Sequence, residues 1–179
     1  MSRGRLLIVR GLPGSGKSTY VHKNYPGLFT LETDMFNMVN GQYVWTRSRS
    51  IEAILLINKI VKTLMMSSNS PDFALTGVFC TFRSVIDHIS NALEYDYDIY
   101  VKTLTTDYGN IHNVPSETIR LFKENFCSEP LFNSYISNYI EHAAPPRSKS
   151  KVFFGDMPPL NWKCNSETQE DTNQSIEQE

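Results

Sequence analysis

Hydrophobic residues along the chain form short apolar runs that alternate with longer stretches of helical spacing. Four runs have the length and composition of buried strands: 6–10, 27–32, 73–79 and 99–104. Four intervening stretches are compatible with helices: 17–23, 48–66, 84–93 and a segment that starts at 115–117. Strands that alternate with helices predict right-handed crossovers and a mainly parallel sheet covered on both faces. The predicted fold class is an α/β three-layer sandwich, with ligands at the carboxyl ends of the strands.

The segment 48–66 has the clearest helical periodicity. Its apolar residues recur at intervals of three and four: Ile51, Ile54, Leu55, Ile57, Val61, Leu64 and Met65. This spacing predicts a long helix with a wide buried face. A turn at Asn40-Gly41 and a short extended piece at 42–45 precede this helix.

The C-terminal part differs in composition from the rest. After Ala143 come proline pairs, basic residues among serines and a short apolar run at 152–154, which suggests an extension with an edge strand. From Asn165 onward the chain lacks aromatic residues and is rich in Glu, Gln, Asn, Ser and Thr, which is typical of disorder. We therefore expect a main domain over 1–143, an extension packed on it over 144–164 and a disordered acidic tail over 165–179.

Composition and charge narrow the function classes. The 179 residues are 40% hydrophobic and 20% charged, as in one ordinary folded domain. The net charge is -2, but the tail carries five acidic and no basic residues, which leaves 17 basic against 14 acidic residues elsewhere. This mild excess permits an anionic substrate.

Apolar runs too short for a membrane span or a signal peptide predict a cytoplasmic protein that binds no membrane. Three distant cysteines favour free thiols over a disulfide framework or a zinc site.

The strongest motif lies between the first predicted strand and the first predicted helix. Gly11, Leu12, Pro13, Gly14, Ser15, Gly16, Lys17 and Ser18 match the Walker A pattern without a mismatch, and Thr19 follows. Glycines let successive backbone N–H groups converge on a phosphate, and the helix adds the positive end of its dipole. Lys17 can reach the β- and γ-phosphates, and the Ser18 hydroxyl can ligate Mg²⁺. The sequence predicts a site for ATP or another nucleoside triphosphate with Mg²⁺.

The next question is which class of P-loop protein this is. Motor ATPases usually end a strand of four apolar residues with a carboxylate, but the third predicted strand runs into Cys80-Thr81-Phe82-Arg83. Small kinases often take their key aspartate from the end of the second strand, where this chain has Asp34. Asp34 is also suited to capping the residues that follow it, so both roles stay open. The pattern favours a phosphotransferase.

Five landmarks follow one another along the chain: GLPGSGKST at 11–19, Asp34-Met35-Phe36, Gly41 to Trp45, Thr81, and Asn110 to Pro115. Their order resembles that of the polynucleotide 5′-hydroxyl kinases of the phage type and their eukaryotic relatives. The resemblance covers about 6–126, two thirds of the chain. It implies a P-loop kinase fold, with Asp34 as the base that accepts the proton of the substrate hydroxyl.

The chain departs from that family pattern at three positions. Gly109 stands where the relatives have an arginine that clamps the ATP phosphates, Cys80 replaces a carboxylate, and Met35 replaces a second acid. Our preferred substitutes for the missing cation are Arg83 and Arg120, although Arg47 and Arg49 are also available.

The leading hypothesis is an ATP- and Mg²⁺-dependent kinase that phosphorylates the 5′-hydroxyl of a nucleic acid end or a nucleotide. Tyr43 and Trp45 are candidates for stacking on a base of a single-stranded end, although alternate aromatics also fit one face of a hairpin. One alternative is a small-molecule kinase acting on a nucleoside or sugar. Another is a degenerate protein that binds ATP or GTP as a structural or regulatory ligand, which the three departures favour.

Overall fold

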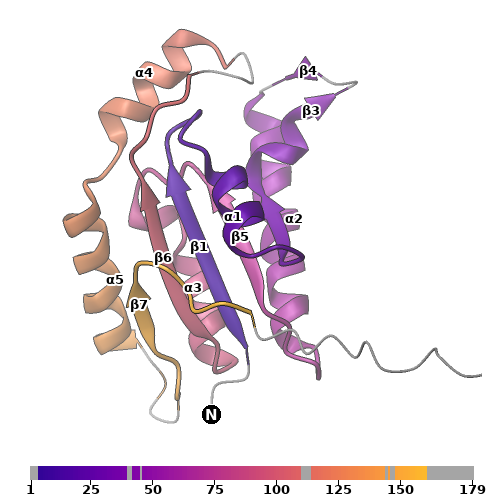
Figure 1. Ribbon diagram of the computed structural model, residues 1–179, viewed down its shortest axis with the longest axis vertical. Coiled ribbons are helices and arrows are strands. Elements are labelled where there is room, and N and C mark those ends of the chain that lie inside the picture. The colour runs from indigo at the N-terminus through magenta and orange to yellow at the C-terminus, as the bar shows by residue number, and fades with distance from the viewer. Residues whose placement is uncertain are drawn as a thin grey trace, which may run out of the picture.

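Five parallel strands form the central sheet of the computed structural model, which describes residues 4–39, 42–44, 46–109, 114–143, 145 and 148–160. The strand order is β2-β5-β1-β6-β7, and every neighbouring pair in this sheet is parallel. The bounds are β1 Arg5–Gly11, β2 Phe29–Glu32, β5 Phe73–Gly77, β6 Asp98–Leu104 and β7 Val152–Phe154. Two short strands, β3 Met38–Val39 and β4 Gln42–Tyr43, pair antiparallel beside the carboxyl edge of the sheet (Figure 1).

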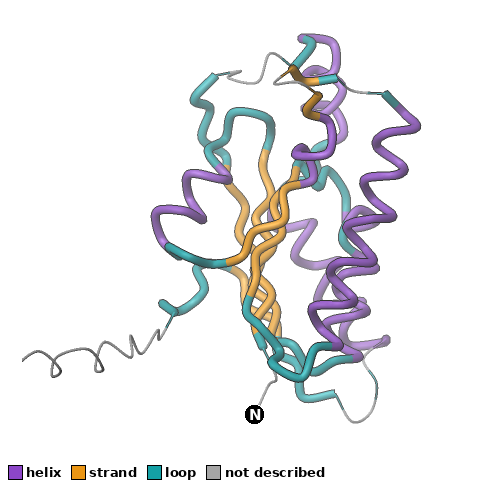
Figure 2. Tube along the Cα trace, turned by 90° about the vertical axis from the view of Figure 1, so that its right-hand side faces the viewer, coloured by secondary structure: helices purple, strands orange, loops and turns teal. Residues whose placement is uncertain are grey.

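Helices cover both faces of this sheet, as the sequence predicts. Figure 2 shows the sheet edge-on between helical layers. Helix α1 (Lys17–Asn24) packs on one face, where Val21 and Tyr25 join the alternate strand residues Leu7 and Val9. On the other face lie α2 (Arg47–Met66), α3 (Ile86–Glu94) and α5 (Glu129–Ala143). Helix α4 (Ser116–Asn125) lies at the carboxyl edge of the strands (Figure 1). The fold class is therefore the predicted α/β three-layer sandwich.

The prediction of a wide buried face on α2 is wrong. The buried positions form a narrow stripe at intervals of four residues: Ala53, Ile57, Val61 and Met65. Ile51, Ile54 and Leu55 are each at least half exposed. Periodicity shows which residues share a helix face, but it cannot show how much of that face meets another element.

Three other predicted boundaries differ from the structure. The third strand ends at Gly77, two residues early, because Phe79 adopts a left-handed conformation with φ of 42° that no strand can contain. The following helix starts at Ile86, after a 3₁₀ turn at Phe82–Ser84. The second strand starts at Phe29, after a turn at Gly27 with φ of 80°.

Sequence analysis did not identify α5, and a buried arginine ties this helix to β1. Arg10 is fully buried, and its guanidinium lies between the rings of Phe126 and Phe132, at 4.1 and 3.7 Å from their centroids. One nitrogen donates to the carbonyl of Cys127 at 2.7 Å. Burial lowers the pKa of Arg10 to about 10, so the guanidinium stays charged at neutral pH. These contacts anchor the α4–α5 connection to the strand that precedes the P-loop.

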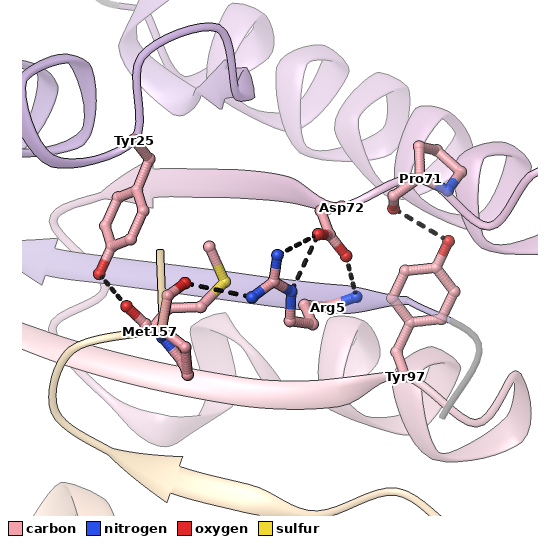
Figure 3. A network of polar contacts seen from close by, with 7 residues as sticks. Arg5, Tyr25, Pro71, Asp72, Tyr97 and Met157 are labelled. Carbon is pink, nitrogen blue, oxygen red and sulfur yellow. Dashed lines mark hydrogen bonds and ion pairs between the residues drawn. The ribbon is translucent and has the colours of Figure 1, made fainter. Parts of the chain in front are cut away.

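Residues after α5 return to the sheet and add β7 at its edge, paired with β6. The end of this segment is fastened to the domain by the polar contacts in Figure 3. Arg5 forms an ion pair with Asp72 at 2.6 Å and also donates to the carbonyl of Pro158. The Tyr25 hydroxyl donates to the carbonyl of Met157 at 2.8 Å, and Met157 itself is buried.

Cys80 and Cys127 are free thiols, both half-buried, while Cys164 and the predicted disordered tail lie outside the described residues. Within the part of the chain that the structure describes, none of the helices combines the length and the apolar character needed to cross a membrane.

Replacing Tyr25 with Phe tests the attachment of the C-terminal segment. The change leaves the buried carbonyl of Met157 without its donor, so we expect the free energy of unfolding to fall by about 1–3 kcal/mol. Tyr135→Phe is the matched control, because Tyr135 is 48% exposed, and its effect should stay within about 0.5 kcal/mol. Urea unfolding measures both values, and equal stabilities for the two variants would contradict the role assigned to this hydrogen bond.

Candidate functional site

The Walker A residues form a loop between the carboxyl end of β1 and the start of α1. Strand β1 lies in the middle of the sheet, and its residues from Leu6 to Gly11 are buried. Ser15 N–H donates to the carbonyl of Leu12 at 3.1 Å and closes the turn. The loop therefore presents its backbone at the carboxyl edge of the sheet, where ligands bind in parallel α/β folds.

Two glycines in this loop hold conformations that a side chain would disturb. Gly14 and Gly16 have φ of 79° and 82°. A Cβ atom on Gly14 would collide with the carbonyl oxygen of Gly109, and one on Gly16 would lie 2.9 Å from the ring of Tyr108. The loop that contains Gly109 and Tyr108 thus packs directly on the P-loop, and the Tyr108 N–H donates to the carbonyl of Gly14 at 2.9 Å.

Lys17 lies within the curl of the loop. It is the first residue of α1 and is 91% buried, with its Nζ atom 2.9 Å from the carbonyl oxygens of both Gly11 and Leu12. A buried ammonium held by carbonyl oxygens is a charge fixed at the position where a P-loop binds phosphate. The role predicted for Lys17 at the β- and γ-phosphates stays a prediction.

Oxygen ligands suited to Mg²⁺ gather beside the loop. Ser18 and Thr19 are exposed on the first turn of α1. Both line a cavity of about 540 Å³ together with Glu32, the last residue of β2. Hydroxyl and carboxylate oxygens are the ligands that Mg²⁺ uses, with water and phosphate oxygens for the remainder. Among the described residues no cluster of three or more His, Cys, Asp or Glu could hold a metal by itself.

Asp34 lies two strands away from the P-loop. Its backbone belongs to a 3₁₀ helix, Thr33–Asn37, that begins where β2 ends. Since β5 lies between β2 and β1, the two strand ends are two spacings apart, about 10 Å. The side chains of Asp34 and Tyr43, and the whole of Trp45, lie outside the described residues.

The two arginines proposed to replace the missing cation occupy different surroundings. Arg120 is 58% exposed on α4 and is ion-paired with Glu117 and Glu124, at 2.5 and 2.6 Å. These carboxylates raise the pKa of Arg120. Arg83 lies at the mouth of a cavity between α2 and α3. The phosphate-binding roles of Arg83 and Arg120 stay predictions.

A second cavity lies on the α4 side of the P-loop. It has a volume of about 450 Å³ and is lined by Leu12 and Pro13 of the loop, by the residues that follow β6, and by Ile119, Lys123 and Phe126. Lys123 brings a positive charge to it, and Asp107 brings a negative charge. Its apolar walls and its contact with the P-loop suit the base and sugar of a bound nucleotide.

The cavity between α2 and α3 contains residues that sequence analysis did not identify. Ser50, on the first turn of α2, and His88, on α3, both line it. His88 is 4% exposed, and burial lowers its pKa to about 4, against the opposing effect of the Asp87 carboxylate. No sequence signal marked either residue, since a serine near a helix start and a lone histidine are both common.

Comparisons with known proteins agree with this architecture. No family model matches the chain. An uncharacterized protein of Pasteurella multocida is 27% identical over 145 residues, covering 73% of this chain and 81% of that protein. The crystal structure of the AvrRxo1-ORF1:ORF2 complex matches 86% of this chain with a TM-score of 0.54 and 12% identity, and the chain spans 55% of that chain. A protein of Chloroflexus aurantiacus assigned as a kinase matches 85% of this chain and 88% of its own, with a TM-score of 0.47 and 15% identity.

The fold is an α/β three-layer sandwich with a Walker A loop after its central parallel strand. At these identities the likeness concerns the fold alone, and it does not extend to the polynucleotide kinase type. Inferences about the chemistry of this protein therefore come from its own P-loop residues and their geometry, and not from these distant relatives.

The buried His88 makes stability depend on pH. An unfolded histidine titrates near 6.5, whereas folded His88 titrates near 4, so the unfolded state binds more protons between these values. The stabilisation is present above pH 6.5 and is lost as the pH falls toward 4, by up to about 1.4 kcal/mol per pH unit. Urea unfolding of the parent and of His88→Asn across this range isolates the effect. Parallel stability curves for the two proteins would contradict it.

Proposed function

We propose that the protein is a phosphotransferase that moves the γ-phosphate of a nucleoside triphosphate, with Mg²⁺, to a hydroxyl group. The observation that carries the proposal is a complete P-loop in which Lys17 contacts the loop carbonyls. The 3₁₀ helix that contains Asp34 follows β2 at the same edge of the sheet. A protein that binds a nucleotide only as a structural or regulatory ligand needs the P-loop, but it needs no carboxylate outside the loop. The arrangement therefore supports transfer over a purely regulatory role.

The residues of the loop would bind and orient the triphosphate. The backbone N–H groups of 14–18 and the Lys17 ammonium would hold the β- and γ-phosphates. Ser18 and Glu32, which line one cavity, provide oxygen atoms for Mg²⁺, directly or through water. When bound, the ion would neutralise charge on the β- and γ-phosphate oxygens.

Asp34 would accept the proton of the attacking hydroxyl. The ends of β2 and β1 are about 10 Å apart. This separation would accommodate the transferred phosphoryl group and the acceptor oxygen between the segment that contains Asp34 and the P-loop. A base placed in this way fits direct in-line transfer.

The finer hypothesis concerns the acceptor. The ordered landmarks that resemble polynucleotide kinases support the 5′-hydroxyl of a nucleic acid end. A nucleoside or other small alcohol requires the same loop and base. Incubation with γ-labelled ATP, Mg²⁺, and a panel of 5′-hydroxyl oligonucleotides, nucleosides and small alcohols distinguishes these acceptors. A tight ATP complex that labels none of them would contradict the phosphotransferase.

Lys17→Ala should lower phosphoryl transfer by at least about 100-fold, because it removes the fixed charge at the β- and γ-phosphates. Lys23→Ala is the matched control on the same helix, since Lys23 is exposed near its end. Single-turnover transfer from labelled ATP measures both variants. Parental activity in Lys17→Ala would exclude the proposed role of the loop.

Asp34→Asn should spare ATP binding and slow transfer by about a hundred- to ten-thousand-fold, because the amide keeps the shape and loses the proton acceptor. Transfer rates and ATP affinity are measured in parallel. A loss of ATP affinity would assign Asp34 to the nucleotide or Mg²⁺ instead, and an unchanged rate would move the base to another residue.

A further inference from the structure

Two cysteines from distant parts of the chain are neighbours in the fold. Cys80 follows the end of β5, and Cys127 lies in the connection between α4 and α5. The backbone N–H of Cys127 donates to the carbonyl of Cys80 at 2.8 Å. Residues paired by backbone hydrogen bonds in sheets have Cα atoms about 5.5 Å apart, and disulfides join Cα atoms that are about 4.4–6.8 Å apart. The two backbones therefore already lie at a separation that a disulfide can span.

The surroundings of both cysteines are fixed by further hydrogen bonds. The carbonyl of Cys127 accepts from the Arg10 guanidinium at 2.7 Å, and Arg10 is fully buried on β1. The Cys80 thiol donates to the carbonyl of Phe122, on α4, at 3.7 Å. Both cysteines are thus held between the end of β5 and the C-terminal part of α4, and little rearrangement is needed to bring them together.

Arg10 provides a positive charge beside the two thiols. Burial has the largest effect on the Arg10 pKa and lowers it, and the effects of Cys127, Cys80 and Glu129, in this order, raise it. Among the described residues, none of the ion pairs involves Arg10, and its Nε and Nη1 atoms have no hydrogen-bond partner. A neighbouring cation of this kind stabilises a thiolate, which is the nucleophilic form of cysteine.

The two thiols differ in their readiness to react. Burial raises the pKa of the Cys80 thiol, against the opposing effect of Arg10, and the Cys80 proton is engaged with the Phe122 carbonyl. A thiolate at Cys127 has a larger effect on the Arg10 pKa than one at Cys80, so the attraction to the guanidinium is stronger at Cys127. Both residues are only half-buried, which favours access by a small oxidant.

From these contacts we propose that Cys80 and Cys127 are a thiol oxidation site, which a small hydroperoxide such as hydrogen peroxide converts into a reversible disulfide. The Cys127 thiolate attacks one peroxide oxygen, the O–O bond breaks, and hydroxide leaves, which gives a sulfenic acid at Cys127. The Cys80 thiol then attacks the Cys127 sulfur, so that the S–S bond forms, the S–O bond breaks, and water leaves with the Cys80 proton.

The electrons and protons balance in this sequence. The two sulfur atoms lose two electrons, and the peroxide gains them and becomes two water molecules once the hydroxide takes up the proton released by Cys127. No step uses a nucleotide, so the proposal does not depend on the phosphotransferase function.

The disulfide would restrain one wall of the cavity next to the P-loop. Phe126 directly precedes Cys127 and lines that cavity together with Lys123 and the P-loop residues Leu12 and Pro13. A bond from Cys127 to Cys80 ties this end of α4 to the segment that follows β5. Oxidation therefore acts on a wall that the P-loop shares with α4.

Peptide mass spectrometry of the folded full chain tests the pairing. After treatment with hydrogen peroxide, a tryptic digest without reductant should contain the peptides of Cys80 and Cys127 joined by a disulfide, and dithiothreitol should restore both thiols. Cys164→Ser is the matched control, which removes the third cysteine and should form the same cross-link. Cys80 and Cys127 that stay unlinked, or that pair with Cys164 instead, would overturn the proposal.

Two single variants test the order of attack. Cys80→Ser removes the resolving thiol, so dimedone, which traps sulfenic acids, should label Cys127. In Cys127→Ser, the label at Cys80 should form at least about 10-fold more slowly, because burial keeps that thiol protonated. Faster labelling of Cys80 than of Cys127 would contradict the role assigned to Cys127.

Thermal unfolding shows whether the folded state accommodates the bond. The oxidised parent should melt at least about 5 °C above the reduced parent, because the cross-link restricts the unfolded chain. Cys80→Ser treated in the same way should show no rise. An unchanged or lower melting temperature of the cross-linked parent would show that the bond distorts the fold, and it would overturn the pairing in the native structure.

Discussion

Burial of β1 on both faces is the constraint on which the rest of the structure depends. Leu6 to Gly11 are all buried between α1 and the opposite helical layer, with β5 and β6 as parallel neighbours. A strand held from four sides fixes the place where the chain leaves the sheet. The P-loop therefore begins from a rigid support, and the backbone amides that would bind phosphate need little ordering when a ligand arrives.

The parallel sheet brings several of the candidate segments to one edge. The P-loop follows β1, the 3₁₀ helix with Asp34 follows β2, the α2–α3 cavity lies beyond β5, and the loop that packs on Gly14 follows β6. These segments are distant in the chain, but parallel strands bring their carboxyl ends together. One cavity at this edge lies against the P-loop residues Leu12 and Pro13 on the side of α4, and another lies between α2 and α3 beyond the end of β5.

Several polar groups are buried in this structure at a cost in stability. Arg10 is desolvated but its guanidinium contacts two aromatic rings and a carbonyl, so its charge contributes to holding α5. The Ser50 Oγ and the His88 Nδ1 are buried without a hydrogen-bond partner among the described residues, and so are the Nε atom and one terminal nitrogen of Arg10. Such buried atoms cost stability, because they lose their hydrogen bonds to water.

Sequence alone determined the alternation of strands and helices, the parallel sheet and the Walker A loop, because these follow from local periodicity and from a contiguous glycine pattern. It could not determine which faces are covered: Ile51 and Leu55 share the helical spacing of Ile57, yet only the packed structure leaves them exposed. Helix α5 was missed because its burial depends on Arg10, more than a hundred residues earlier. Ser50 and His88 meet at one cavity through the packing of α2 on α3, and such long-range packing leaves no periodic signal in either segment.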